Sequence, residues 1–188
     1  MQNNYTYDVA MFRDTFETRF TYLNGFMRNV SRFKTRPAMT DPLSGRRWTY
    51  EELNIEANRL AHALRASGVG KNDVVMFTLL NSPEFVFCYL AAHKVGAIAC
   101  PVNYRQGAGE IALVIDDSCP KAFLYDAEFG ELSAGALNMC QHKPGAVVMV
   151  DYKGGAQVPK GHILYKDYVS GQSEDDPPVD FHPHIYDE

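Results

Sequence analysis

The stretch with the clearest chemical potential is KGGAQVPKG, residues 153–161. Paired glycines permit tight turns, and lysines and backbone N–H groups are the groups that hold phosphates. The stretch has no Ser or Thr hydroxyl, however, and it lacks the GxxxxGK[ST] spacing of a phosphate loop. No strongly patterned helix follows it. We therefore expect a solvated surface loop.

A second glycine pattern, Gly68-Val69-Gly70, is half of a GxGxxG motif. It ends an expected helix and precedes an expected strand, which is the reverse of the dinucleotide-binding order. This order excludes a nucleotide role for the pattern.

The histidines and carboxylates form no complete site. His182-Pro183-His184 resembles a chelating pair, but no third ligand is apparent, and a linker is the favoured interpretation. Neighbouring carboxylates do not face each other on a helix. Such pairs occur at Glu51-Glu52, Asp116-Asp117 and Asp175-Asp176. No nucleophile has a partnered base. The residues alone therefore predict no catalytic residue and no metal site.

Composition narrows the function classes. The chain has 188 residues, is 46% hydrophobic and 22% charged, and carries a formal net charge of −5. No basic stripe appears, so we expect no nucleic-acid partner.

The cysteines form no CxxC pair, and we expect reduced core thiols. They are Cys88, Cys100, Cys119 and Cys140. No signal-peptide pattern or membrane-spanning run is seen, so a cytoplasmic location is expected.

The N-terminal region, residues 1–36, is expected to be helical. Apolar residues recur at spacings of three and four: Phe12, Phe16, Phe20, Leu23, Met27 and Val30. Asn24-Gly25 is expected to interrupt the helix. Charges of both signs occupy the polar side: Arg13, Asp14, Glu17 and Arg19. This mixture predicts packing against the main body rather than on a membrane.

Residues 37–172 are expected to form an α/β subdomain with a mostly parallel sheet. Residues 37–50 predict a β-hairpin around the turn cluster 41–45. Thr49 and Glu52 have the spacing of a capping box, and Gly68 is placed to end that helix. The apolar run 74–80 does not alternate, which is typical of a central parallel strand.

Strands and helices then alternate, which indicates βαβ units. Further strands are expected at 97–102, 121–125 and, as the last one, 146–150, and helices at 85–95, 109–117 and 129–140. Residues 163–169 predict one short helix or turn. Residues 173–188 are acidic and proline-rich and predict an exposed linker.

The segment from Thr49 to Arg105 resembles the opening region of the adenylate-forming, or AMP-binding, superfamily. The matching pieces are Thr49-Tyr50-x-Glu52-Leu53, Ala57-Asn58-x-Leu60-Ala61, Gly68-Val69-x-x-x-Asp73-x-Val75, Asn81-Ser82-Pro83-Glu84, Lys94-x-Gly96-Ala97 and Pro101-x-Asn103. Two of these, extended to Asn81–Phe85 and Pro101–Arg105, are most similar to acyl-CoA synthetases (acid–CoA ligases).

The resemblance implies ATP, Mg²⁺ and CoA as cofactors and substrates of a parent enzyme. It implies that a carboxylic acid, such as a fatty acid, is activated as an acyl-adenylate and transferred to CoA. The family's ATP motifs lie downstream of this region, so no catalytic residue can be assigned here. Pro159-Lys160-Gly161 copies only the end of that signature loop. Asn103 and Arg105, after an expected strand, are our candidates for an indirect cofactor-binding role. The alternative for both is capping and packing.

Two hypotheses follow. The first is an N-terminal fragment of an acyl-CoA synthetase, inactive alone, whose partner is the remainder of the same chain. The second is a stand-alone, non-catalytic α/β module with a binding or scaffolding role.

Overall fold

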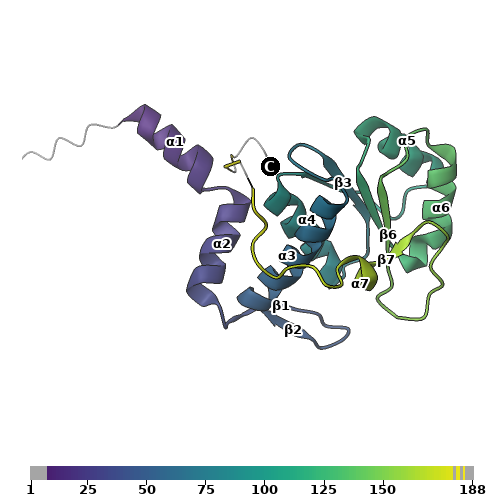
Figure 1. The fold of residues 1–188 in the computed structure, drawn as a ribbon, viewed down its shortest axis with the longest axis horizontal. Coiled ribbons are helices and arrows are strands. Elements are labelled where there is room, and N and C mark those ends of the chain that lie inside the picture. Colours follow the sequence, from purple (N-terminus) through teal and green to yellow (C-terminus); the bar gives the residue numbers. More distant parts are fainter. Residues whose placement is uncertain (1–7, 180, 183, 185–188) are drawn as a thin grey trace, which may run out of the picture.

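A five-stranded sheet forms the centre of the computed structural model, which describes residues 8–179, 181, 182 and 184. Its strand order is β4-β3-β5-β6-β7, and every neighbouring pair is parallel (Figure 1). The strands are β3 (Val74–Thr78), β4 (Ile98–Pro101), β5 (Ala122–Asp126), β6 (Ala146–Val150) and β7 (Ile163–Leu164). This sheet confirms the predicted α/β class.

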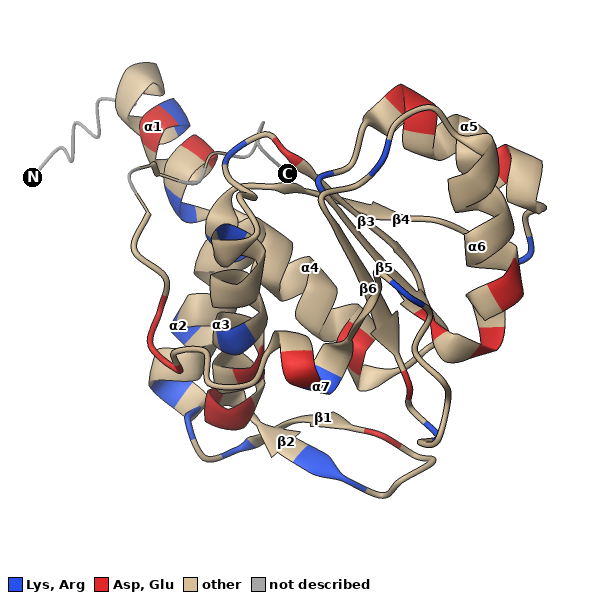
Figure 2. Ribbon diagram, turned by 45° about the vertical axis from the view of Figure 1, so that its right-hand side comes forward, with Lys and Arg blue, Asp and Glu red and all other residues tan. Residues whose placement is uncertain are grey.

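Helices cover both faces of the sheet (Figure 2). One face packs against α3 (Tyr50–Ala66) and α4 (Pro83–Val95), and the other against α5 (Ala108–Ser118) and α6 (Gly130–Met139). Side chains of strand β3 contribute to the hydrophobic cores on both faces of the sheet. Val75 and Phe77 join the core under α3 and α4, whereas Met76 joins the core under α5 and α6. Side chains alternate across a strand, so an unbroken apolar run fills two cores.

The predicted ends of α3 are confirmed. The Glu52 N–H donates to Thr49 Oγ1 at 3.2 Å, and the Thr49 N–H donates to Glu52 Oε2 at 2.8 Å, which completes the capping box. After the helix, Gly68 adopts a left-handed φ of +82°. Val69 is buried, and its N–H donates to the Leu64 carbonyl at 3.0 Å. These contacts supply the hydrogen bonds that helix ends otherwise lack.

The predicted hairpin is present, but the prediction of the last strand is wrong. Strands β1 (Pro37–Thr40) and β2 (Arg47–Thr49) pair antiparallel. Beyond β6, however, the chain returns as β7 and continues as α7 (Tyr165–Tyr168). Two residues are too few to display a strand period, and backbone pairing with β6 alone defines β7.

The interruption of the N-terminal helix lies earlier than predicted. Helices α1 (Val9–Arg19) and α2 (Tyr22–Phe33) meet at Thr21, whose hydroxyl accepts the Asn24 N–H at 3.2 Å. The Asn24 side chain also donates to the Thr18 carbonyl at 2.6 Å. Asn24 and Gly25 therefore lie inside α2, and the prediction that they break the helix is wrong. A hydroxyl cap decides the break, not the glycine.

The predicted packing of this region against the body is wrong for α1. That helix has no buried residue, and Phe12, Phe16 and Phe20 are 42%, 45% and 57% exposed. Helix α2 does pack, since Leu23 is buried and Phe26 lies against the main core. Figure 1 shows α1 (purple) extending away from the sheet.

Residues 173–179, which we call the C-terminal strap, are mostly exposed. Residues 180, 183 and 185–188 of the predicted linker lie outside the described residues, and the linker role stays a prediction. The strap is nevertheless anchored to α3 and α4. Asn58 Nδ2 donates to the Glu174 carbonyl at 2.6 Å, and Arg59 pairs with the Glu174 carboxylate at 2.5 Å. Asp176 reaches Lys94 Nζ at 2.7 Å. Lys94 is a buried cation, and the strap supplies its counter-charge.

The cysteines are all free, but they are not all in the core. Cys88 and Cys140 are buried and Cys100 is half-buried, whereas Cys119 is exposed. The prediction of a core thiol is therefore wrong for Cys119. This residue follows α5 in a left-handed conformation, with φ 45°, at a surface turn.

Candidate ligand cleft at the carboxyl end of the sheet

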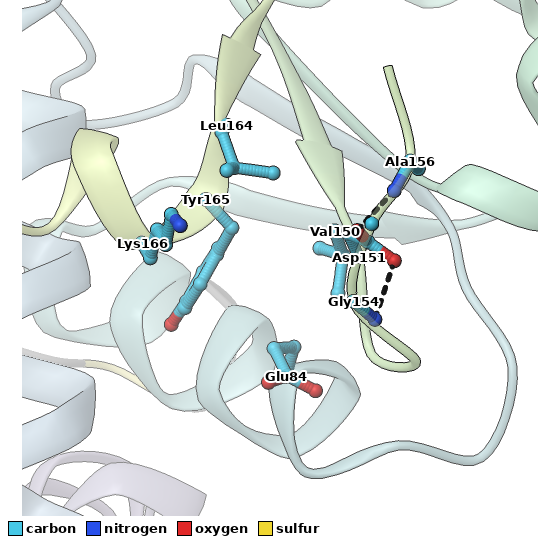
Figure 3. A pocket seen from close by; sticks show the side chains of 9 residues that line it. Glu84, Val150, Asp151, Gly154, Ala156, Leu164, Tyr165 and Lys166 are labelled. Atoms are coloured by element: carbon cyan, nitrogen blue, oxygen red, sulfur yellow. Dashed lines mark hydrogen bonds between the residues drawn. The ribbon is translucent and has the colours of Figure 1, made fainter. Parts of the chain in front are cut away.

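The parallel strands β3, β5 and β6 end together at one edge of the sheet, where α/β proteins place ligand contacts. A cavity of about 380 Å³ opens at this edge (Figure 3). Glu84 of α4 forms one wall, Asp151 and the loop after β6 form a second, and Leu164–Lys166 form a third. We take this cavity as the candidate ligand cleft.

Glu84 is one of the two acids that line the cleft. It lies in the first turn of α4, where the positive end of the helix dipole favours a carboxylate. Burial acts in the opposite direction and raises its pKa. Glu84 Oε2 is buried and makes no hydrogen bond within the described part of the chain. Glu84 therefore favours a hydrogen-bonding partner brought into the cleft.

A second cavity, of about 390 Å³, lies on the hairpin side of Glu84. Its wall includes Asp41, which is buried at the start of the hairpin turn. Asp41 accepts hydrogen bonds from the hydroxyls of Ser44 and Tyr152. These bonds lower the pKa of Asp41 to about 2. The contact with Tyr152 joins the hairpin to the loop that follows β6.

The loop of residues 153–161 is engaged with its own neighbours. Asp151 accepts the Gly154 N–H at 2.9 Å and the Ala156 N–H at 2.7 Å (Figure 3). Lys153 forms an ion pair with Glu128. Two amides of the loop and one of its two lysines, Lys153, are thus occupied by carboxylates of this chain. These contacts argue against a phosphate site in this loop.

The far end of this loop is held by His162. Its Nδ1 lies 2.6 Å from the hydroxyl of Tyr125 on β5. Burial raises the pKa of Tyr125 to about 12 and lowers that of His162, so a neutral pair is favoured. This contact fixes the entry into β7, and with it the wall formed by Leu164–Lys166.

Asn103 and Arg105 lie outside this cleft. They follow β4, which is separated from β6 by β3 and β5. Asn103 Oδ1 accepts the Arg105 N–H at 3.0 Å, and the Arg105 guanidinium lies 5.7 Å from the centre of the Tyr104 ring. These are the contacts of a capped turn, as in the alternative stated for both residues. A cofactor-binding role for them stays a prediction.

Other members of the cleft were not identified from the sequence. Tyr165 is buried, and its hydroxyl has no hydrogen-bond partner among the described residues. Burial raises its pKa well above the ordinary value. The Asp-Pro-Leu-Ser sequence indicated a turn in which the Asp41 side chain accepts hydrogen bonds. No local pattern indicated that Tyr165 and the Oε2 atom of Glu84 are buried. Both depend on how α4 and α7 meet the sheet.

Comparison with known proteins identifies the class. The family model for AMP-binding enzymes matches residues 26–183, which is most of the chain. The chain therefore belongs to the AMP-binding enzyme family, and it is most like the N-terminal region of acid–CoA ligases. Both parts of the predicted resemblance are confirmed. None of the described helices combines the length and the apolar character that a membrane span requires.

The relatives are CoA ligases of different acids. A 3-hydroxybenzoate/4-hydroxybenzoate–CoA ligase of Thauera aromatica is 36% identical over 66% of this chain and 23% of its own length. The long-chain-fatty-acid–CoA ligase FadD13 of Mycobacterium tuberculosis is 39% identical over 48% of this chain and 18% of its own. The chain thus spans about a quarter or less of these relatives.

Solved structures share the fold. The anthranilate CoA ligase AuaEII, in complex with anthranoyl-AMP, matches with a TM-score of 0.72. The match covers 85% of this chain and 30% of that one, at 23% identity. At this identity the likeness concerns the fold alone.

Proposed function

We propose that this chain is the N-terminal part of an ATP-dependent acid–CoA ligase. The family match over residues 26–183 carries the proposal. In the first step, a carboxylate oxygen of the acid attacks the α-phosphorus of ATP, which forms the acyl-adenylate and releases pyrophosphate. In the second step, the thiol of CoA attacks the acyl carbon, AMP leaves, and the thiol proton goes to solvent. The thioester is the product.

The role proposed for this region is structural, with its cleft facing the rest of the enzyme. The described acids of the cleft, Glu84 and Asp151, would repel the phosphates of ATP. Two of the loop amides, those of Gly154 and Ala156, are already bonded to Asp151. We therefore assign the ATP contacts to residues outside this chain and propose that the chain alone is inactive.

The cofactors and the substrate are parts of the same proposal. ATP and CoA follow from the ligase assignment. Mg²⁺ would assist as a Lewis acid on the phosphates. Within the described residues, however, no group of three or more His, Cys, Asp or Glu side chains is placed to hold a metal ion. We accordingly assign no metal-dependent step to this chain.

The relatives include aromatic-acid and fatty-acid ligases, so a fatty acid is one substrate class and a benzoate the other. A cytoplasmic location also stays a proposal.

Acid-dependent exchange of labelled pyrophosphate into ATP tests this function. The 188-residue chain and the product of its complete gene are assayed side by side against benzoates and fatty acids. We expect exchange by the complete product and none by the chain. Exchange by the chain itself would refute its inactivity. A complete product that activates no acid would refute the ligase assignment.

The gene sequence beyond Glu188 separates this proposal from the non-catalytic module. A frame that continues into a Ser/Thr/Gly-rich run ending in Pro-Lys-Gly supports the ligase. A stop codon immediately after Glu188 supports a binding or scaffolding module.

A further inference from the structure

The exposed surface of α1 and the start of α2 form one patch, which we call the aromatic arm. Its apolar part consists of Val9, Phe12, Phe16 and Phe20, each 42–57% exposed. The ring of Phe16 lies 4.4 Å from that of Phe12 and 4.7 Å from that of Phe20, between ring centres. The family match begins at residue 26, so α1 lies outside the part of the chain that the family shares.

Arginines border this apolar stripe on both sides. A helix turns about 100° per residue, which places Arg13 and Arg19 about 60° to either side of Phe16. By the same geometry Glu17 lies about 100° from Phe16, and Asp14 about 160°. The charges of both signs that the sequence displays are therefore sorted around the helix, with the cations nearest the aromatic rings.

Contacts within the fold strengthen this separation. The guanidinium of Arg28, on α2, lies 5.5 Å from the centre of the Phe20 ring, and its Nη1 donates to the Arg19 carbonyl at 2.6 Å. Glu17 is engaged within the chain, with its Oε2 3.3 Å from His184 Nε2 in the C-terminal tail. The Asp8 carboxylate is used at the N-terminus of α1, where it accepts two backbone N–H groups. The exposed face is thus aromatic and cationic.

The charge of the whole chain is divided in the same way. Residues 1–50 contain eight Lys and Arg against four Asp and Glu, a net charge of +4. Residues 51–188 contain ten against nineteen, a net charge of −9. Most of this excess lies in α2 and the hairpin, because α1 with its cap carries Arg13 and Arg19 against Asp8, Asp14 and Glu17. Helix α1 is the only helix of the described chain that buries no residue and is longer than one turn. Figure 1 shows that this helix stands clear of the sheet.

We propose that the aromatic arm binds the surface of a membrane that contains anionic lipids. The Phe rings would enter the boundary between headgroups and acyl chains, while Arg13, Arg19 and Arg28 contact lipid phosphates. A second copy of the chain is a poorer occupant, because two such faces would bring their arginines together. A neutral surface would leave the arginines without counter-charge.

Cosedimentation with lipid vesicles tests the proposal on the 188-residue chain. The vesicles contain equal amounts of phosphatidylglycerol and phosphatidylcholine, or phosphatidylcholine alone. We expect binding to the anionic vesicles that weakens as salt is raised, and little binding to the neutral ones. Phe16→Asp is expected to lower the partition coefficient roughly tenfold or more, because it removes a ring and adds a repelled charge.

Met11→Asp is the matched control. Met11 is 66% exposed on the same helix, about 140° from Phe16, so this variant adds the same charge on the other face. It is expected to retain most of the binding. Three results would overturn the proposal: no binding to anionic vesicles at low salt, equal losses in both variants, or equal binding to neutral vesicles. Concentration-dependent self-association without vesicle binding, abolished by Phe16→Asp, would overturn it in favour of a second copy.

Discussion

Helices α1 and α3 both carry an apolar stripe, yet only one of them buries it. In α3, Ala57, Leu60 and Leu64 are fully buried. In α1, Phe12 and Phe16 are about half exposed, although Phe is the larger and more apolar side chain. Helix α3 lies between the sheet and the strap, whereas no strand or helix covers the α1 stripe within the described residues. A periodic stripe indicates that a face can be buried, but burial also needs an opposing surface.

The largest expected difference between the body and α1 is the loss of stability when an aromatic ring is truncated in each. Phe77 is fully buried in β3, with its ring 5.2 Å from Phe85 and 5.3 Å from Tyr89. Phe77→Ala should lower the free energy of unfolding by about 3–5 kcal/mol, because it leaves a cavity. The matched change Phe16→Ala in α1 should alter it by less than about 0.5 kcal/mol. Urea unfolding measures both. A loss of about 2 kcal/mol or more in Phe16→Ala would show that α1 packs in solution.

The second comparison concerns two contacts of the C-terminal region, Lys94 with Asp176 and Glu17 with His184, which should differ in their contribution to stability. The side chain of Lys94 is 3% exposed, and Asp176→Asn would leave its charge buried without a partner. Since the side chain of Asp176 is itself 55% exposed, we expect a loss of about 1–2 kcal/mol at neutral pH rather than the full cost of a buried pair. Glu17→Gln removes the contact between Glu17 of α1 and His184 of the C-terminal tail. It should lower the free energy of unfolding by less than about 0.5 kcal/mol.

The pH dependence of the Asp176→Asn variant has a defined sign. Burial lowers the pKa of Lys94 below its ordinary value of 10.5, so the folded chain releases this proton at a lower pH than the unfolded chain. The unfolded state then binds more protons, and stability rises as pH increases from the folded pKa toward 10.5. Loss of Asp176 lowers the folded pKa further and widens this window. The variant should therefore recover part of its stability in alkaline solution. No recovery there would contradict a charged, buried Lys94.

Removing the N-terminal caps of α3 and α1 should give a smaller difference in stability between the body and the N-terminal helix. Thr49→Ala removes the hydroxyl that caps α3 and should cost about 1 kcal/mol in urea unfolding. Asp8 caps α1 by accepting the Ala10 N–H at 2.9 Å and the Met11 N–H at 3.1 Å. Asp8→Ala should lower helix content by circular dichroism without a change in the unfolding midpoint. A shifted midpoint for Asp8→Ala would mean that α1 unfolds together with the body.

The smallest expected effect concerns the acid of the cleft. Burial raises the pKa of Glu84, so the folded state holds this proton more tightly than the unfolded state. Stability should then fall as pH rises from the ordinary value of 4.5 to the folded pKa. Glu84→Gln removes this decline and should gain a few tenths of a kcal/mol at neutral pH. An unaltered profile in Glu84→Gln would show that Glu84 ionises normally.

Local signals in the sequence predicted much of the body. The capping box at Thr49, the stop at Gly68 and the unbroken apolar run of β3 each act within a few residues, and each is confirmed. One error was local, since the Thr21 hydroxyl rather than Asn24-Gly25 sets the break between α1 and α2. Other features that the sequence did not show depend on partners distant in the chain. The two-residue β7 exists only through its pairing with β6, and the strap is held by Lys94, more than eighty residues earlier than Asp176.

The candidate cleft was less predictable than the fold. Its acids were visible in the sequence, but their surroundings were not. The sequence showed Glu84 only as part of the motif Asn81-Ser82-Pro83-Glu84, and the structure shows it half-buried between two cavities, with its Oε2 atom buried. Asp151 was unremarked, and it holds the amides of the loop that contains the paired glycines. The contacts of one side chain with a remote loop leave no periodic trace in a sequence.

The sequence by itself determined the alternation of strands and helices, their caps and the family, because these depend on residue order and short spacing. Only the tertiary structure decided which apolar stripe is covered, which acids are buried and which termini are anchored. These outcomes depend on what surface lies opposite each side chain. The exposed α1 and the buried Oε2 atom of Glu84 are the clearest cases, since in both the residue type pointed to the opposite environment.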